Sequence, residues 1–177
     1  VVMGNIQLLL RQHVGAPCEP VVKAGDLVKK GTLVAKPTGL GANIFSSVYG
    51  VVEEIKEDRI VIRPDEEQPD EYEKIPEGTP LEMVKAAGVV GMGGAGFPTG
   101  IKLDAHLDHG YILINAAECE PGLYHNIRQI EQQSDKIVRG VKYCMDIAGA
   151  DKAIFAIKKK MKRRLTRSAP QSKMRKP

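Results

Sequence analysis

The chain has 177 residues, of which 42% are apolar and 27% charged. These values suit one ordinary domain or two small ones and exclude global disorder. No apolar run approaches the ~18 residues that span a bilayer, and the N-terminus lacks the basic stretch and cleavage site of a secretory signal. Three widely spaced cysteines form no disulfide framework and no metal motif, which favours a reducing cytoplasm.

The net charge of +4 hides an uneven distribution of charge along the chain. Residues 158–177 contain ten Lys or Arg and no acid, so residues 1–157 hold 16 basic and 22 acidic side chains. Because the body of the protein is mildly acidic, a folded surface that binds nucleic acid specifically is not expected.

Residues 6–62 predict an all-β domain, because Gly or Pro interrupts the chain every few residues. The β-rich steps fall at residues 21–22, 27–28, 33–35, 44–45, 48–55 and 59–62. Gly25, Gly31 and Gly50 each predict a tight turn. The two similar halves of this stretch resemble the barrel-sandwich fold of lipoyl and biotinyl domains. Those carriers present a lysine on a hairpin, whereas residues 37–47 contain none, so a carrier function is not expected.

Residues 63–80 are acidic and contain proline, which predicts a solvated linker and a domain boundary. From there to residue 157 the pattern predicts a helix, a Gly-rich loop, a strand, a long helix and a second strand. The predicted ranges are 81–87, 88–100, 111–115, 126–148 and 153–157. Ser134 is placed to cap a second helical segment, and Gly149 to end the helix. The continuously apolar strand at 111–115 suits a buried parallel sheet.

This order implies a right-handed βαβ unit. The predicted fold class is therefore α+β with two small domains. An N-terminal all-β barrel-sandwich (lipoyl-like) domain spans 6–62, and the first part of an α/β Rossmann-like nucleotide-binding domain spans 81–157.

Residues 91–100 contain five glycines. Without Cβ atoms, such a backbone can approach a phosphate or a ring closely, and Lys102 follows within reach of a phosphate charge. The loop is no Walker A motif, and from glycine density alone a simple turn is equally favoured.

A second candidate element, Asn115 to Gly122, follows the predicted strand directly. Ligands of open α/β sheets bind beyond the carboxyl ends of strands, and Asn115 offers both a donor and an acceptor. Glu118 and Glu120 form a close carboxylate pair there. No His, Ser or metal-ligand set accompanies them at useful spacing, so we assign no catalytic residue and no metal ligand.

The two motifs GMGGAGFPTGIK and INAAECEPG together resemble the flavin- and NADH-binding subunits of respiratory and Rnf-type complexes. The AECEP turn and the N-terminal barrel-sandwich domain are most similar to the C subunit of the Rnf electron transport complex. The opening RQHVGAPCEPVVKAGDLVKKGTLVAKP also resembles the proline reductase-associated electron transfer protein, a soluble relative. The resemblance covers about residues 6–157.

The resemblance implies an electron-transfer flavoprotein-like subunit. It would accept electrons from NADH through FMN and pass them to iron-sulfur centres or a partner reductase. The residues implied as flavin or dinucleotide contacts are Gly91, Gly93, Gly94, Gly96, Lys102, Asn115 and Glu118. Ala117 stands where respiratory NADH subunits carry Asp, which weakens the case for full NADH dehydrogenase chemistry. A 4Fe-4S cluster is implied only for a full-length parent.

The implied partners are other subunits of an electron-transfer complex or a reductase. The implied location is cytoplasmic, with at most peripheral association at the cytoplasmic face of the membrane. The alternative function is a non-catalytic docking or scaffold module of such a complex.

After Ile157 the hydrophobic periodicity ends and the chain departs from the family pattern. A truncated or frameshifted copy is favoured over a genuine basic tail that contacts an acidic partner, nucleic acid or an anionic membrane. We expect residues 158–177 to be disordered. We expect the 177-residue chain by itself to lack activity and to bind FMN weakly or not at all.

The remaining cysteines and histidines are expected to be structural. Cys18 is predicted to be buried in a turn, Cys144 to lie in the core, and Cys119 to be inert because its acidic neighbours oppose the thiolate. The four histidines lack metal-ligand spacing.

Overall fold

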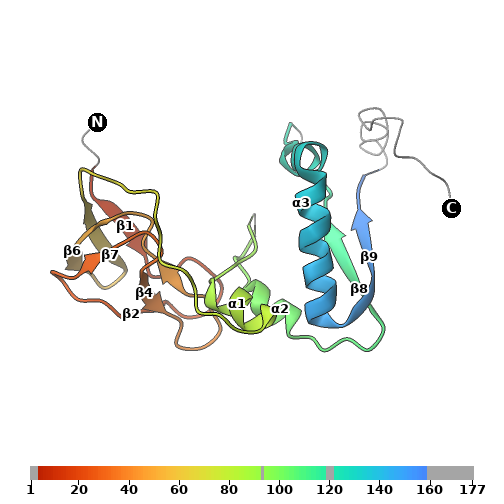
Figure 1. The fold of residues 1–177 in the computed structure, drawn as a ribbon, viewed down its shortest axis with the longest axis horizontal. Helices are drawn as coiled ribbons and strands as arrows, with labels where there is room; N and C mark the ends of the chain where they lie inside the picture. The colour runs from red at the N-terminus through yellow and green to blue at the C-terminus, as the bar shows by residue number, and fades with distance from the viewer. Residues whose placement is uncertain (1–3, 93, 119–121, 159–177) are drawn as a thin grey trace. The chain divides into compact units, whose positions relative to one another are not determined.

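The computed structural model describes residues 4–92, 94–118 and 122–158 (Figure 1). The chain divides into two compact units, Val1–Asp104 and Ala105–Pro177, each of which is described by itself. The acidic segment and the Gly-rich loop both belong to unit 1, and the domain boundary expected at 63–80 stays a prediction.

Unit 1 begins with two antiparallel sheets, as the all-β prediction for residues 6–62 requires. The four-stranded sheet has the order β1 (Ile6–Leu9), β7 (Arg59–Pro64), β6 (Gly50–Ile55) and β3 (Leu27–Val28). The three-stranded sheet has the order β2 (Glu19–Pro20), β4 (Leu33–Lys36) and β5 (Ile44–Phe45). One hydrophobic core joins both sheets. Its fully buried Val34, Val52, Ile60 and Ile62 each stabilise the fold by roughly 1.5–3 kcal/mol.

Two local predictions for this region were wrong. The strand expected at residues 21–22 lies at Glu19–Pro20, and Val21 only donates its amide to Val34 O at 2.9 Å. Gly50 forms no turn but begins β6, where an added Cβ atom would lie 2.3 Å from Arg63 O. Glycine is needed there because two paired strands approach closely. The positive φ angles at Gly25 and Gly31 confirm the other two turns.

The acidic segment 65–79 has no helix or strand, and nearly all of it is exposed. It is nevertheless hydrogen-bonded to the sandwich. The Gln68 side chain bonds both backbone groups of Tyr49, at 2.7 and 3.0 Å, and Glu73 N donates to Lys30 O at 2.8 Å. The segment therefore follows the surface of unit 1 instead of connecting two bodies freely.

Two short helices complete unit 1. The helix predicted at 81–87 is confirmed as α1 (Pro80–Ala86), which begins with a capping box between Thr79 and Glu82. The second helix is α2 (Thr99–Leu103), directly after the Gly-rich loop. The helices contact each other at Gly100, where an added Cβ atom would lie 2.5 Å from Lys85 Cγ.

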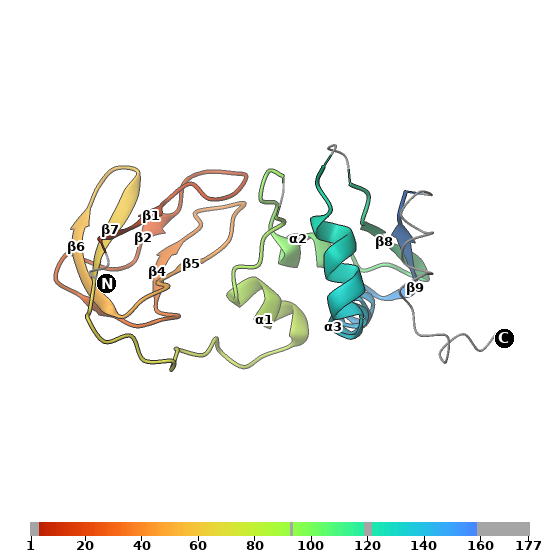
Figure 2. The same cartoon turned by 90° about the horizontal axis from the view of Figure 1, so that it is seen from above.

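Unit 2 is a βαβ unit, as the sequence predicts. Strands β8 (Gly110–Asn115) and β9 (Ala150–Ala156) pair in parallel, and α3 (His125–Ala148) lies between them in the chain. Figures 1 and 2 show α3 running alongside the two strands. The backbone of α3 is non-helical at Gln133, so a second segment starts beside Ser134, as expected. Gly149 ends the helix with φ 72°, which confirms the predicted stop.

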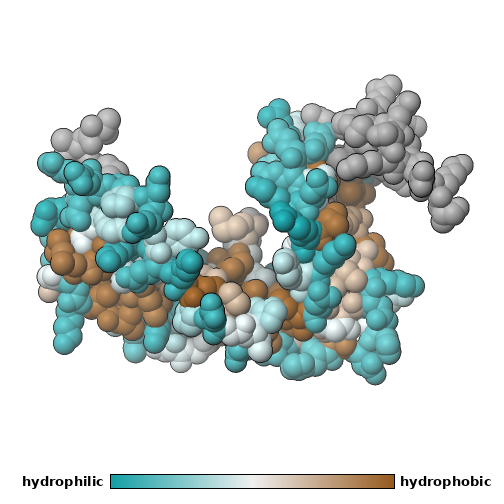
Figure 3. Space-filling model, in the orientation of Figure 1, coloured by the Kyte–Doolittle hydropathy of each residue, from teal (hydrophilic) through white to brown (hydrophobic). Residues whose placement is uncertain are grey.

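The strands of unit 2 are less buried than their apolar sequences predict. Ile112 and Ile114 are half-buried, but Tyr111, Leu113 and Ile154 are 56, 72 and 49% exposed. Paired residues of parallel strands share a face, so one face of β8 and β9 is open among the described residues of unit 2. Hydrophobic residues show at the surface over these strands in Figure 3. Within the described ranges, no helix is long and apolar enough to cross a membrane.

Candidate functional site

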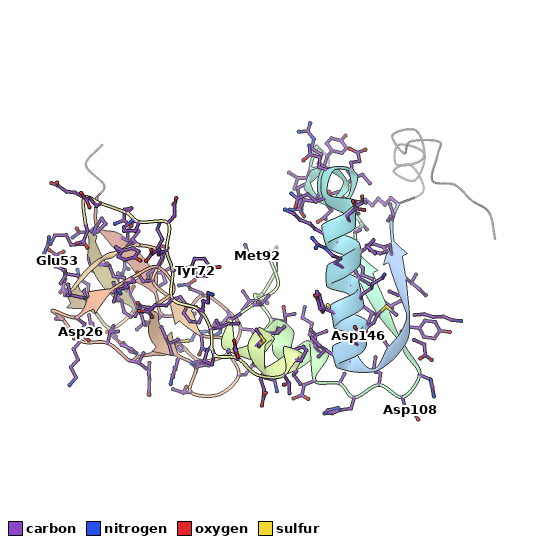
Figure 4. All side chains as sticks on the ribbon, viewed as in Figure 1. Asp26, Glu53, Tyr72, Met92, Asp108 and Asp146 are labelled. Carbon is purple, nitrogen blue, oxygen red and sulfur yellow. The ribbon has the colours of Figure 1, made fainter. Side chains whose placement is uncertain are left out.

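The Gly-rich loop of unit 1 is closed at its base, here called the neck, and is exposed at its tip. Thr99 N donates to Val89 O at 2.8 Å and Gly91 N donates to Phe97 O at 2.9 Å, which closes the neck. Met92, labelled in Figure 4, lies at the tip and is 94% exposed. Gly93, one of the predicted contacts, lies outside the described residues. The described tip residues, Met92, Gly94 and Ala95, are exposed.

The tip has the space and the charge that an anionic ligand requires. An added Cβ atom at Gly94 would meet no other atom within 4 Å, and one at Gly91 would lie 3.6 Å from Lys102 Nζ. Lys102 Nζ also lies 5.9 Å from the centre of the Phe97 ring and forms no ion pair with any described residue. Among the described residues, the amides of Gly94 and Ala95 donate to no protein acceptor. Backbone amides without a protein acceptor and an ammonium group without an ion pair, both in this region of the described chain, are groups that bind a phosphate.

Gly96 differs from Gly91 and Gly94 because it packs closely against the sandwich of its own unit. It is buried, its φ is +67°, and an added Cβ atom would lie 3.0 Å from His13 Cα. A side chain is therefore excluded here by the protein itself. The role of Gly96 as a flavin contact stays a prediction.

The predicted site residues Asn115 and Glu118 belong to unit 2. Asn115 is the last residue of β8, and its Oδ1 accepts a hydrogen bond from Ala117 N at 3.1 Å. This places a mainly exposed amide at the carboxyl end of the parallel strands, where ligands of α/β sheets bind. Glu120 and Cys119 lie outside the described residues, so the paired carboxylates expected there stay a prediction.

Glu118 is buried at the start of α3, and its side chain is only 3% exposed. Its Oε1 accepts hydrogen bonds from Asn126 N at 2.6 Å and Ile127 N at 3.3 Å, and Oε2 lies 3.5 Å from His125 Nδ1. Asn126 Nδ2 donates to the same carboxylate at 3.2 Å. Glu118 thus satisfies free amides of the first helical turn and places a negative charge at the positive end of the helix.

Sequence reasoning missed this capping role. Tyr124, at the usual capping position, provides no side-chain cap. The capping carboxylate comes instead from Glu118, in the turn after β8. Glu118 lies too far before α3 in the chain for a capping pattern in the sequence to identify it.

A second cluster that the sequence did not reveal lies in unit 1. Cys18 and His13 are both buried, and Cys18 Sγ lies 3.2 Å from His13 Nε2 and 3.3 Å from Ala42 O. Burial raises the pKa of the Cys18 thiol, so this pair is not a thiolate nucleophile. The expected burial of Cys18 is confirmed, whereas Cys144 is only half-buried. The described residues contain no group of His, Cys, Asp and Glu that could hold a metal.

Two grooves of the structure contain none of the predicted site residues. A groove of about 490 Å³ in unit 1 is lined in part by Phe45, Tyr72 and Met83. A groove of about 430 Å³ in unit 2 is lined in part by Val138 and Phe155. The described site residues predicted from the sequence therefore lie outside both grooves: those of unit 1 lie in and just after the Gly-rich loop, and Asn115 and Glu118 lie in unit 2.

Two protein-family models match this chain, one over the sandwich and one over the region that contains the Gly-rich loop. Residues 2–68 match the RnfC barrel sandwich hybrid domain, and residues 84–175 match the Nuo51 FMN-binding domain. The second match includes the Gly-rich loop and the end of β8, and it continues through residues 159–175, beyond the described part of the chain.

Several curated proteins are similar to the chain. It is 40% identical to the C subunit of the proton-translocating ferredoxin:NAD(+) oxidoreductase complex of Clostridium ljungdahlii, over 84% of this chain and 37% of the relative. It is 36% identical to the C subunit of the Na(+)-translocating ferredoxin:NAD(+) oxidoreductase complex of Acetobacterium woodii, over 82% and 37%. It is 46% identical to the cobalamin reductase PduS of Citrobacter freundii, over 50% and 19%. The chain thus spans about a third of the length of these C-subunit relatives.

Proposed function

The chain belongs to the RnfC family, which joins a barrel sandwich hybrid domain to a Nuo51-type FMN-binding domain, and on this premise we propose that its Gly-rich loop binds the phosphate of FMN. The observation that carries the proposal is the open tip of the loop. A Cβ atom added at Gly94 would meet no other atom within 4 Å, and the Lys102 ammonium lies beside Gly91 without an ion-pair partner among the described residues. A phosphate would gain backbone hydrogen bonds and a charge-assisted contact there.

The other predicted contacts belong to the same proposal. Asn115, at the carboxyl end of β8, would present its amide to the edge of the flavin. Unit 2 would be the first part of a Rossmann-like domain. Glu118 would act through α3, because its carboxylate oxygens already accept amide hydrogen bonds from Asn126 and Ile127.

The proposed role of the chain is that of an electron-transfer subunit. FMN, when bound, would supply the redox chemistry by which electrons pass from NADH to iron-sulfur centres or a partner reductase. The residues of this chain bind and orient the cofactor. The proposed partners are other subunits of an electron-transfer complex, and the proposed location is the cytoplasm or the cytoplasmic face of a membrane. The names of the C-subunit relatives, which belong to ferredoxin:NAD(+) oxidoreductase complexes, support this proposal.

The test is a titration of the isotopically labelled chain with FMN, followed by the amide resonances in NMR spectra. Of the two outcomes expected for the 177-residue chain, weak binding and no binding, the proposal requires weak binding, which is sufficient for this experiment. We expect the resonances of Gly91, Gly94 and Ala95 to shift together, with Asn115 as the expected responder in unit 2. A titration to millimolar FMN without shifts at the loop, or with shifts confined to other residues, would contradict the proposal.

The structure offers a matched pair of lysine variants for this titration. Lys102 Nζ lies 5.9 Å from the centre of the Phe97 ring, and Lys152 Nζ lies 5.9 Å from the centre of the Tyr111 ring. Lys102→Gln and Lys152→Gln therefore remove the same charge and the same kind of ring contact. We expect the first variant to weaken FMN binding about tenfold, or ~1.4 kcal/mol, and the second to leave it unchanged.

A further inference from the structure

The Gly-rich loop is seated on two loops of the sandwich. One is the segment 11–17, which Cys18 N closes by donating to Leu10 O at 2.8 Å. The other is the segment 37–43, which connects β4 to β5. Figure 2 shows both loops extending side by side from the sandwich. They are close enough that a Cβ atom at Gly15 would lie 2.0 Å from Leu40 O.

His13 holds these two loops together. Its Nδ1 lies 2.9 Å from Val14 O, which can only accept, and its Nε2 lies 3.1 Å from both Ala42 N and Ala42 O. With the proton on Nδ1, the neutral ring donates to Val14 O and accepts from Ala42 N. This assignment follows from the hydrogen-bond network, because Ala42 N can only donate. The ring also packs on Gly41, where an added Cβ atom would lie 2.5 Å from Cε1. The imidazole therefore fixes the segment 37–43 against the segment 11–17.

The same residue forms the seat of the loop at its C-terminal side. The Cβ position of Gly96 lies 3.0 Å from His13 Cα and 3.1 Å from Gln12 O. Gly96 is buried, whereas Gly94 and Ala95 before it and Phe97 after it are exposed. Gly96 is thus the point at which the exposed tip returns to the protein, and its support is the backbone around His13.

The N-terminal side of the loop is fixed by Asn43. Its Nδ2 donates to Ala86 O, at the end of α1, at 3.0 Å. Two residues later, the Cβ position of Gly88 lies 2.4 Å from Asn43 O, and the φ of Gly88 is +65°. The chain therefore leaves α1 and enters the Gly-rich loop in contact with the same segment 37–43 that His13 holds.

We propose that His13 and Asn43 are positioning residues that set the conformation of the Gly-rich loop for its ligand. Neither residue belongs to the loop tip, and both act through the backbone of Ala42, Gly88 and Gly96. The sandwich is then a platform for the loop, and the β4–β5 connection, which carries the lysine in acyl carriers, serves here as part of the seat. The role in flavin binding rests on the proposed function, whereas the seating of the loop does not.

The test measures amide hydrogen exchange by NMR in the full 177-residue chain. The probes are the amides of Gly91 and Thr99, which close the neck of the loop. In His13→Leu, Ala42 N loses its acceptor, and we expect both probes to exchange at least about tenfold faster. In His13→Gln, the side-chain oxygen can replace Nε2 as acceptor, so we expect exchange within about threefold of the unchanged protein. Asn43→Ala should accelerate the same probes even if His13→Leu fails to fold.

The matched control is Val52→Ala, which removes volume from the sandwich core without touching the seat. We expect this variant to lower global stability while the neck amides keep their local exchange rates. The proposal is overturned if His13→Leu and Asn43→Ala leave both probes unchanged, or if Val52→Ala accelerates them equally. FMN titrations of the same variants separate the two proposals. If exchange is accelerated in the variants but FMN shifts no amide resonance in the unchanged protein or in any variant, the role in flavin binding is refuted. The proposed seating of the loop then still stands.

Discussion

Replacing Glu118 by alanine removes the group that completes the first turn of α3. The carboxylate accepts hydrogen bonds from two backbone amides, and one of them belongs to Ile127, which is fully buried. Losing a helix cap costs about 1 kcal/mol, and leaving a buried amide without an acceptor costs roughly 1–3 kcal/mol. Because the two effects overlap, we expect Glu118→Ala to destabilise unit 2 by about 2–3 kcal/mol.

Glu118→Gln is the control for the charge. The amide oxygen can still accept the hydrogen bonds from Asn126 N and Ile127 N. The NH2 group cannot accept from Asn126 Nδ2, and the attraction between the carboxylate and the helix N-terminus, worth roughly 0.3–1 kcal/mol, is also lost. Gln should therefore recover part of the stability that Ala loses.

Urea unfolding, followed by circular dichroism, measures these losses. Helix α3 has 24 residues and dominates the helical signal of the described chain. With a slope of about 1–3 kcal/mol per molar urea, the midpoint of Glu118→Ala should fall by roughly 0.7–3 M. A midpoint equal to that of the unchanged protein, or equal losses in the Ala and Gln variants, would refute the capping role.

Three further predictions concern other contacts of the structure. Gly149→Ala should lower the melting temperature by an amount equivalent to at least about 1 kcal/mol. The reason is that the φ of Gly149 is +72° and the new Cβ would lie 2.5 Å from Leu107 O. An unchanged melting temperature would contradict this prediction. Thr79→Ala should cost about 1 kcal/mol in urea unfolding, because it removes the capping box with Glu82; no loss would show that the box contributes nothing to α1. Cys18 should react with iodoacetamide at pH 8 far more slowly in the native than in the unfolded chain, because burial raises the pKa of its thiol and lowers the thiolate fraction. Mass spectrometry of Cys18 peptides measures this, and equal rates would contradict it.

Most elements of the fold could be predicted because they depend on local patterns. The helix at α1, the strands β8 and β9, and the end of α3 at Gly149 follow from apolar periodicity and glycine placement. The role of Gly50 could not be predicted, because a glycine at a close strand approach looks the same in sequence as a glycine in a turn. The exposure of Leu113 was also missed, since an apolar run does not tell which of its two faces is covered.

The candidate site was predictable in part. The Gly-rich loop and Lys102 stand out because their chemistry lies in consecutive residues. The roles of Glu118 and His13 depend on contacts made across the fold, with the start of α3 and with Ala42, 29 residues away. Tertiary contacts of this kind leave no local pattern, so only the structure reveals that one residue caps a helix and the other supports the loop.

The most direct test of the central claim compares FMN with riboflavin, which lacks the phosphate. Flavin fluorescence during titration with the 177-residue chain gives both dissociation constants. If the Gly-rich loop holds the phosphate, FMN should bind at least about tenfold more tightly than riboflavin. Lys102→Gln should reduce that difference while Lys152→Gln preserves it. Equal affinities for the two flavins, or a preference for FMN that survives Lys102→Gln unchanged, would contradict the account.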